Sequence, residues 1–489
     1  MEALISRVEL MKKRNWFRVF LFVAPIIIGM IGFLVEGKCG LSEALFRCVT
    51  MYLVEYGDTP PNVFVDVARW LAPLATASGI LLLFSVTKDS ILNAFRYLRG
   101  DSIAVYGPEA EQEQTLCELG KKGIRGKDKL VKAGRYILLS TEEENIAFYT
   151  KYKEKLEKRI VYFRVKMLSS QHSFNARLIP FSREEIAARV FWKEHCIYNL
   201  VRESANQAMI VLLGFGNLGE ELLYWGLQKN IFSPDQMINY HVFGDCESFL
   251  ATHTELNHIS DPIHYHSETW TQSINVLQSA SMIIVVDQEN QTKLLRDLRR
   301  ILPTAPIIVF CKSNEFAELE QKMWECETFN WIEKSSVVQN ILSDQIYQLA
   351  KSINLRYQHI YSGVEETDDN RELEWQKLDS FTRMSNISAA DYHEIRSIML
   401  NEMHLHPNEL NANTIELLSE LEHIRWCRFH YLNNWQYGIQ KDGPTKHSTL
   451  RIHQMLRPYS ELDEKEKEKD RENIRVLLSI PYKDAKIGT

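Results

Sequence analysis

Two long runs of uncharged, mostly apolar residues stand near the start of the chain, at residues 19–35 and 70–87. Each is close to the roughly 20 residues that a helix needs to cross the hydrocarbon core of a bilayer. We therefore predict a hairpin of two membrane spans within residues 1–92. A buried core helix is the alternative for the second run, which contains Pro73 and Gly79.

Basic residues lie outside both runs: Lys12, Lys13, Arg14 and Arg18 precede the first, and Lys88, Arg96 and Arg99 follow the second. Lys and Arg collect on the cytoplasmic side of membrane spans. We therefore expect a multi-pass protein of the inner (plasma) membrane with both termini in the cytoplasm. The loop between the runs is mildly acidic and is expected to face outward.

After residue 100 the pattern changes to short β-rich runs that alternate with helical periodicity. The runs cover residues 102–107, 134–141, 159–167, 209–215, 238–245, 280–287 and 305–312. Such alternation predicts parallel sheets. We place one α/β domain at residues 93–195 and a second at residues 196–362. Residues 363–489 follow, with a polar linker at 364–376 and a small, mainly α-helical domain.

The second α/β domain carries a glycine motif between a strand and a helical segment. Gly214, Gly216 and Gly219 permit a tight turn and a close approach of backbone amides to a pyrophosphate. The next strand ends at Asp245, whose carboxylate suits a ribose with a free 2′-hydroxyl. This pattern predicts a Rossmann-like nucleotide site at Gly214, Gly216, Asn217, Gly219 and Asp245. A glycine turn kept only for the fold is the alternative.

The segment between the two apolar runs resembles the pore module of two-span potassium channels, over roughly residues 16–90. A helical stripe runs from Leu41 to Tyr52 and is followed by EYGDTPP. The resemblance implies a gating hinge at Gly79, permeant monovalent cations, a tetramer, and a filter formed by Val54, Glu55, Tyr56, Gly57 and Asp58. Glu55 stands where that family has a glycine, which departs from the potassium-selective pattern. A ring of carboxylates still favours cations over anions, and a hairpin anchor with an acidic loop is the alternative.

Tandem α/β units behind such a hairpin resemble the RCK (TrkA-N) regulatory domains of potassium channels and transporters, over residues 101–345. The first unit is degenerate, because Gly107 opens its turn without a second or third glycine. The resemblance implies a sensor that binds NAD, ADP, ATP or a signalling nucleotide. It implies no catalytic residue.

Three separated blocks near the C-terminus resemble the RyR domain, over about residues 380–485. They contain Glu422, His423, Arg425 and Trp426, then Asn434, Trp435, Tyr437 and Gly438, and finally Leu456, Pro458, Tyr459 and Leu462. The resemblance implies a small-ligand pocket, for which Trp426, Trp435, Tyr437 and Arg457 supply rings that stack and a guanidinium that clamps. Tryptophans that only anchor a core are the alternative, which we favour for Trp426.

Charge, cysteine usage and residue spacing argue against several other functions. The net charge of −7 over 489 residues argues against a nucleic-acid partner, because phosphate backbones require a surplus of Lys and Arg. The eight cysteines form no C-x-x-C pair, which is typical of a reducing compartment. Histidines crowd at residues 253–266 without the spacing of a zinc motif, so no metal is predicted. Tyr149 and Lys153 have the spacing of a dehydrogenase pair but precede the glycine motif, so no enzyme activity is predicted.

The fold class predicted from these patterns is a membrane α-helical hairpin with a pore-like helix, two Rossmann-like α/β domains, and a mainly α-helical C-terminal domain. The function they favour is a homo-oligomeric, ligand-gated cation channel that a nucleotide regulates. Its expected partners are membrane lipid, monovalent cations and a small nucleotide. The alternative is a membrane-anchored, nucleotide-sensing effector of bacterial antiviral defence that perturbs the bilayer without a selective pore.

Overall fold

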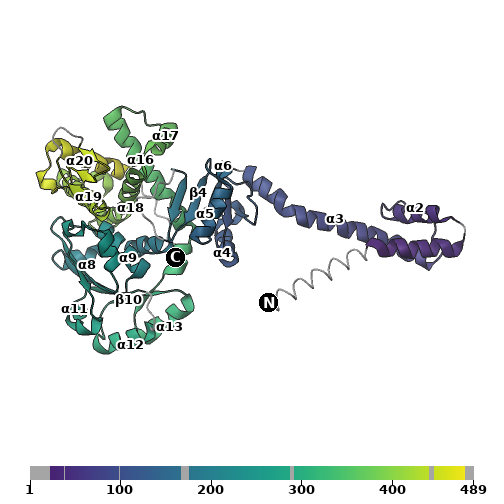
Figure 1. Ribbon diagram of the computed structural model, residues 1–489, viewed down its shortest axis with the longest axis horizontal. Coiled ribbons are helices and arrows are strands. Elements are labelled where there is room, and N and C mark those ends of the chain that lie inside the picture. Colours follow the sequence, from purple (N-terminus) through teal and green to yellow (C-terminus); the bar gives the residue numbers. More distant parts are fainter. Residues whose placement is uncertain are drawn as a thin grey trace. The chain divides into compact units, whose positions relative to one another are not determined.

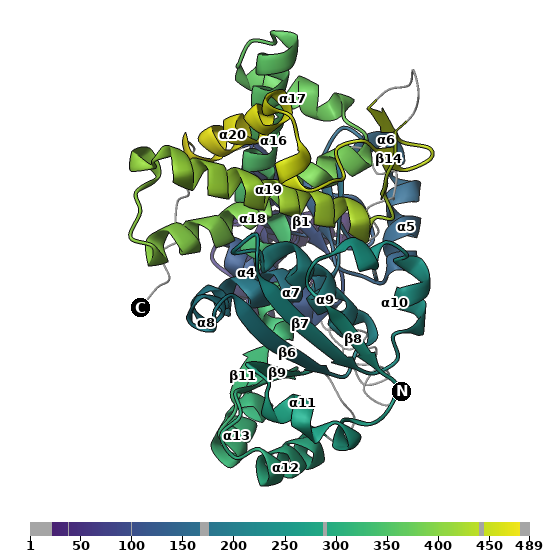
Figure 2. The ribbon, with the colours of Figure 1, turned by 90° about the vertical axis from the view of Figure 1, so that its left-hand side faces the viewer.

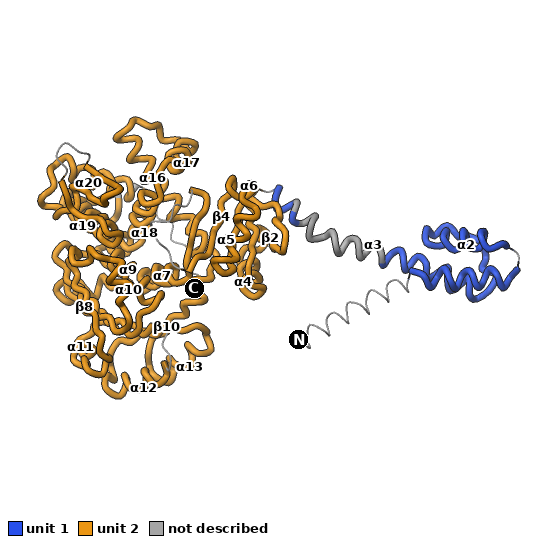
Figure 3. Tube along the Cα trace, in the orientation of Figure 1, with its two compact units in different colours: residues 1–99 blue, residues 100–489 orange. Residues whose placement is uncertain are grey.

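The computed structural model describes residues 22–37, 39–98, 100–166, 176–286, 291–439 and 445–479, with the backbone alone at residues 79, 81–92, 94, 408 and 479. The chain divides into two compact units, residues 1–99 and residues 100–489 (Figure 3). The first unit ends at residue 99, whereas the hairpin domain is predicted to end at residue 92.

The first unit is helical. A helix over residues 22–36 is followed by α2 (Leu41–Met51) and α3 (Val63–Leu98). Small residues let these helices pack closely, since a Cβ added to Gly29 would lie 2.7 Å from the Sγ of Cys48 and 3.2 Å from the Cβ of Ala68. Asn62 precedes α3, and its Oδ1 accepts a hydrogen bond from the amide of Val65 at 3.1 Å. This bond caps the helix at its start.

None of the helices in the described part of the chain is both long and apolar enough to cross a membrane. The first apolar run begins at residue 19 and lies partly outside the described residues. The second falls within α3, where the side chains of residues 81–87 are also outside them. The two spans therefore stay predictions.

The first α/β domain, in which Figure 1 labels β4 (Ile160–Arg164) and α4 (Glu109–Leu119), contains a sheet of five parallel strands in the order β2-β1-β3-β4-β5. Its strands are β1 (Ile103–Tyr106), β2 (Gly123–Arg125), β3 (Arg135–Leu138), β4 (Ile160–Arg164) and β5 (Leu178–Phe181). Its helices are α4 (Glu109–Leu119), α5 (Glu142–Lys151) and α6 (Lys153–Leu156). The three runs predicted here as strands are β1, β3 and β4.

The second α/β domain contains six parallel strands in the order β11-β10-β9-β6-β7-β8. They are β6 (Gln207–Leu213), β7 (Met237–Phe243), β8 (Ile263–His266), β9 (Met282–Val285), β10 (Ile307–Cys311) and β11 (Glu327–Asn330). The helices are α7 (Arg183–Glu194), α8 (Tyr198–Glu203), α9 (Gly216–Lys229), α10 (Glu247–Thr252), α11 (Ile274–Gln278), α12 (Gln291–Ile301), α13 (Asn314–Trp324), α14 (Trp331–Ser336) and α15 (Val338–Leu342). Both sheets confirm the predicted pair of Rossmann-like α/β domains.

Alternate residues of β6 face two different cores. Ile210 and Leu212 pack in the core that holds α7 and α9, whereas Val211 and Leu213 pack in the core that holds α12. This is the period of two that a strand covered on both faces requires. Helices therefore cover both faces of the second sheet.

The C-terminal region is mainly helical, as predicted. It contains α16 (Asp344–Ser362), α17 (Asp368–Lys377), α18 (Ser380–Glu402), α19 (Ala412–Leu432) and α20 (Glu464–Ser479). A small sheet of β12 (Gln436–Tyr437), β14 (Ile452–His453) and β13 (Lys446–His447) lies beside them. The helices α18 and α19 contact α9 of the second α/β domain (Figure 2).

The linker predicted at residues 364–376 is wrong for most of its length, because residues 368–377 form α17. The hydroxyl of Thr367 accepts a hydrogen bond from the amide of Asn370 at 3.2 Å and so caps this helix. Trp375 is 2% exposed and packs in a core with α16 and α18. The capping bond of Thr367 and the burial of Trp375 thus stabilise a helix in a segment whose many charged residues predicted a linker.

Candidate ligand sites

The turn between β6 and α9 has backbone angles that glycine adopts easily. Gly214 has a φ of 94° and Gly216 a φ of 56°, in the region where a Cβ is strained. A Cβ added to Gly219 would lie 3.1 Å from the ring of Phe215 and 3.2 Å from the carbonyl oxygen of Gly214. Among the described residues no side chain caps α9, and there Gly216 is exposed and Asn217 is half-exposed. The first amides of the helix therefore stand open at the sheet edge.

The end of β7 lies directly beside this turn. The amide of Gly214 donates to the carbonyl of Phe243 at 2.8 Å, which holds the carboxyl ends of the two strands together. Asp245 follows and is exposed, and its Oδ1 accepts from the amide of Glu247 at 3.2 Å. The structure thus brings the five residues of the predicted nucleotide site to one edge of the sheet, where parallel α/β sheets bind ligands.

The far end of α9 is fixed to the C-terminal region by buried polar contacts. Lys229 is 1% exposed, and its Nζ lies 3.0 Å from Oδ2 of Asp391 on α18. The hydroxyl of Ser388, also on α18, donates to Oε1 of Gln228 at 2.7 Å. One helix therefore connects the glycine turn to the C-terminal region, and a displacement of α9 would disturb both.

A second candidate site is a cavity of about 520 Å³ in the C-terminal region, lined from α16, α18, α19, α20 and the small sheet. Its aromatic wall is built around Trp426. The ring of His430 lies 4.0 Å from the Trp426 ring, and that of His453 stands edge-on at 4.8 Å. Asn354 is 3% exposed, and its Nδ2 has no hydrogen-bond partner among the described residues. The cavity thus offers ring faces and an unused amide donor.

The histidines of this cavity differ in charge. Burial lowers the pKa of His453 to about 4 and that of His430 well below its ordinary value, so both are neutral at pH 7. Burial, the largest single influence, acts to lower the pKa of His423, but the hydrogen bonds and charges of Asp470 and Cys427 together raise the pKa to about 11. Lys446 places its Nζ 5.5 Å from the centre of the ring of Phe381, which also lines the cavity. The cavity therefore combines neutral rings with a cation beside its aromatic wall.

Of the four residues predicted for this pocket, only Trp426 lines the cavity. Trp426 lines the cavity, whereas Trp435 is 4% exposed and packs in the small core behind it. Tyr437 is 49% exposed on β12, and Arg457 is not part of the lining, although its carbonyl accepts from Nε2 of His423 at 2.8 Å. The alternative of a core anchor therefore fits Trp435, whereas Trp426 both lines the cavity and packs against that core, so its ligand role stays a prediction.

Sequence reasoning missed other lining residues, namely His430, His453, Lys446 and Asn354. The spacing of Trp426 and His430, four residues apart on α19, was a signal that could have indicated a shared helix face. No comparable signal existed for Asn354, which comes from α16 and meets α19 only through the tertiary packing.

The residues of the predicted filter form the turn between α2 and α3. Val54 has a φ of 62° and is 75% exposed, an outlier for a β-branched residue. Tyr56 packs its ring edge-on against Phe33 at 5.8 Å, while Glu55, Gly57 and Asp58 are exposed. Gly79 lies within α3. A filter needs carbonyls from several copies, so the filter and hinge roles of these residues stay predictions.

The histidine-rich segment contains a short hydrogen-bonded chain. Nδ1 of His241 lies 2.9 Å from Nε2 of His266, whose Nδ1 lies 2.9 Å from Oε1 of Glu268. Within the described ranges no group of three or more His, Cys, Asp or Glu residues has a metal-binding arrangement. The partners of His266 are thus a ring nitrogen and a carboxylate of the protein itself.

Comparisons with known proteins identify one domain of the chain and two solved structures of low similarity. No curated protein sequence matches the chain. The crystal structure of GsuK bound to ADP is similar over 68% of this chain and 98% of that chain, with 14% identity and a TM-score of 0.34. The crystal structure of L-tryptophan dehydrogenase from Nostoc punctiforme is similar over 68% of this chain and 88% of that chain, with 10% identity and a TM-score of 0.24. The RyR domain family matches residues 396–482, so the chain carries an RyR domain in its C-terminal region.

Proposed function

We propose that this chain is a nucleotide sensor that regulates an N-terminal membrane pore. The observation that carries the sensing role is α9, which starts uncapped at the glycine turn and ends at the buried pair of Lys229 and Asp391. A phosphate group at the turn would accept hydrogen bonds from the first amides of α9, and the helix dipole would favour its charge. A ligand that binds one position of α9 better than another shifts the arrangement of the RyR domain.

The candidate ligands of the glycine turn are NAD, ADP, ATP and signalling nucleotides, because all of them present a phosphate and a ribose. Asp245 stands exposed where it can accept hydrogen bonds from ribose hydroxyls. The RyR cavity is a second ligand site in this proposal. Its ring faces and the amide of Asn354 suit a planar, polar group such as a nucleobase.

The sensing role is tested by replacing Asn217 with aspartate, which sets a carboxylate beside the expected phosphate without changing the side-chain shape. We expect ADP or NAD to raise the melting temperature of the purified full-length chain, and Asn217→Asp to lower its affinity for that nucleotide at least about tenfold. Asn275→Asp, on exposed α11 of the same domain, is the matched control and should bind normally.

A third variant, Trp426→Ala, shows which of the two candidate sites binds the nucleotide. Trp426→Ala should leave binding at the glycine turn intact, so a nucleotide whose effect disappears in Trp426→Ala but persists in Asn217→Asp occupies the RyR cavity instead. If no nucleotide changes the melting temperature of the unmodified chain, the sensor proposal fails.

The membrane role of the N-terminal unit is supported by its surface. More than half of the exposed large apolar side chains among the described residues lie between residues 22 and 80. They include Ile27 at 53%, Val35 at 71% and Trp70 at 69% exposure. Apolar surface of this extent suits contact with lipid or with other copies of the chain. We propose a homo-oligomeric pore at the plasma membrane, with Glu55 and Asp58 near the path of monovalent cations.

Flux measurements test the pore. The full-length chain reconstituted in liposomes should conduct monovalent cations in response to the nucleotide found above, and Glu55→Gln should reduce the preference for cations over anions several-fold. Glu43→Gln, which removes an acid paired with Arg47 on α2, is the control. Release of a large trapped dye without ion preference would instead favour the membrane-perturbing effector.

A further inference from the structure

Arginines gather at the carboxyl edge of the first sheet, where a Rossmann-like domain binds its ligand. Arg125 ends β2, Arg164 ends β4, and Arg183 follows β5 as the first residue of α7. The strands β2, β4 and β5 are three of the five in this parallel sheet. Their carboxyl ends therefore present guanidinium groups on the same edge.

The turn after β1 does not have the open glycine geometry of the second domain. A Cβ added to Gly107 would lie 2.6 Å from the Cβ of Leu139, so this turn is closed against the end of β3. Pro108 precedes α4 and has no amide hydrogen to offer an anion. Any anion at this edge would be held by side chains rather than by the backbone.

The carboxylate of Glu111, in the first turn of α4, sits between two of these arginines. Its Oε2 lies 2.7 Å from Nη1 of Arg164 and 2.7 Å from Nη2 of Arg183. Nε of Arg164 donates to the carbonyl of Ser140, after β3, at 3.1 Å, which fixes the direction of that guanidinium. Oε2 of Glu111 thus lies between the guanidinium groups of Arg164 and Arg183.

Two guanidinium groups share one carboxylate oxygen at this edge. The side chains of Arg164 and Arg183 are 17% and 22% exposed, and Oε2 of Glu111 lies beside both. Arg125 is engaged by Glu113 and by Oε1 of Gln112. Burial and the positive charge of Arg164 lower the pKa of Arg183, although Glu111 and Glu184 act to raise it. The two arginines therefore repel each other at a largely buried position, where a carboxylate that both share holds them.

We propose that Arg164 and Arg183 form a binding site for a phosphate-bearing ligand, in which Glu111 is the internal occupant that the ligand displaces. A guanidinium pairs with two oxygens of a phosphate, and two guanidiniums match the greater charge of a phosphate better than that of one carboxylate. This site is separate from the glycine turn, and it does not depend on the function proposed above.

The test measures pyrophosphate binding to the full-length chain by calorimetry, in an Asn217→Asp background that weakens the glycine turn. Glu111→Gln removes the competing charge and should raise the affinity for pyrophosphate about tenfold or more. Adding Arg183→Gln to Glu111→Gln should abolish that gain. If Glu111→Gln leaves the affinity unchanged, the cluster is only an ion pair between elements and the proposal is overturned.

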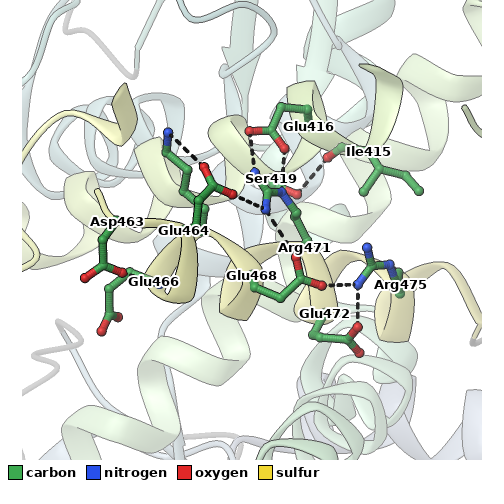
Figure 4. Close-up of polar contacts among 11 residues, drawn as sticks. Ile415, Glu416, Ser419, Asp463, Glu464, Glu466, Glu468, Arg471, Glu472 and Arg475 are labelled. Atoms are coloured by element: carbon green, nitrogen blue, oxygen red, sulfur yellow. Dashed lines mark hydrogen bonds and ion pairs between the residues drawn. The ribbon is translucent and has the colours of Figure 1, made fainter. Parts of the chain in front are cut away.

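A matched control exists on α20, where the carboxylate of Glu468 also lies between two arginines (Figure 4). Its oxygens lie 3.2 Å from Nη1 of Arg471 and 2.6 Å from Nη1 of Arg475. Glu468→Gln makes the same charge change on a helix surface away from any sheet edge, and it should not raise the affinity. If Glu111→Gln does not fold, Glu111→Asp can replace it in the test. The shorter side chain retracts the carboxylate by one methylene, so the affinity for pyrophosphate should still rise, but by less than in Glu111→Gln.

Discussion

Replacing Glu422 with glutamine is expected to destabilise the RyR domain by about 3–5 kcal/mol, because it leaves two buried cations without their counter-charge. Glu422 is 5% exposed, and its partners Arg396 and Arg425 are 0% and 1% exposed. Its Oε2 lies 2.9 Å from Nη2 of Arg396, and its Oε1 lies 2.8 Å from Nη2 of Arg425.

The effect depends on pH in a defined direction. Burial acts to raise the pKa of Glu422, but the two arginines outweigh it and hold the pKa below 4.5. The stabilisation by this carboxylate is therefore fully present above pH 4.5 and is lost as the pH falls through the lowered pKa. The difference between the variant and the unmodified chain should narrow in strong acid.

Hydrogen exchange of the amides in α18 and α19 measures this loss locally, without requiring the whole chain to unfold in one step. Glu416→Gln is the matched control, because Glu416 lies on the same helix and pairs with Arg471 while 41% exposed (Figure 4). An exposed pair of this kind contributes about 1 kcal/mol or less. Equal protection in the two variants would contradict the buried-triad argument.

Replacing Glu320 with glutamine is expected to stabilise the second α/β domain at alkaline pH. Glu320, on α13, is 2% exposed, and neither of its carboxylate oxygens has a partner among the described residues. Burial raises its pKa to about 7. The folded chain therefore keeps this proton up to about pH 7, whereas the unfolded chain releases it near pH 4.5. Stability falls as the pH rises from about 4.5 through 7 and beyond.

Glutamine cannot ionise, so the Glu320→Gln variant does not lose stability in this way as the pH rises. At pH 8 it should be more stable than the unmodified chain by roughly 2–3 kcal/mol, since each pKa unit corresponds to about 1.4 kcal/mol. At pH 5 the two should nearly coincide. Urea unfolding at both pH values checks this, and Glu318→Gln, exposed on the same helix, should show no such change. A gain of the same size at pH 5 and pH 8 would show that the proton is not its cause.

The sequence predicted the long and central strands because their apolar runs are continuous. Each of the seven predicted runs contains a strand, and β6 and β7 begin and end within two residues of the prediction. The edge strands β2, β5, β8 and β11 lie outside these runs, because polar residues or a proline interrupt their apolar residues. Their positions follow from pairing with a neighbouring strand, which is a tertiary effect.

The candidate sites also divide into one that local sequence predicts and others that depend on tertiary packing. The glycine turn was predictable, because backbone angles demand glycine at positions a few residues apart. The meeting of Glu111 with Arg164 and Arg183 was not, because it depends on the tertiary arrangement that brings the end of β4 and the start of α7 beside the first turn of α4. Likewise, spacing alone could not tell that Trp435 would turn into a core while Trp426 lines the cavity.

The shared core of the second α/β domain and the RyR domain limits how this chain could be divided or recombined. Ile210 and Leu222 belong to the same buried cluster as Ile395 and Leu421, which come from α18 and α19. A fragment that stops after residue 362 would expose that cluster to water and leave the ammonium of Lys229 without Asp391. The RyR domain is thus not an exchangeable cassette on this scaffold, and a chimaera must carry the matching face of α9 along with it.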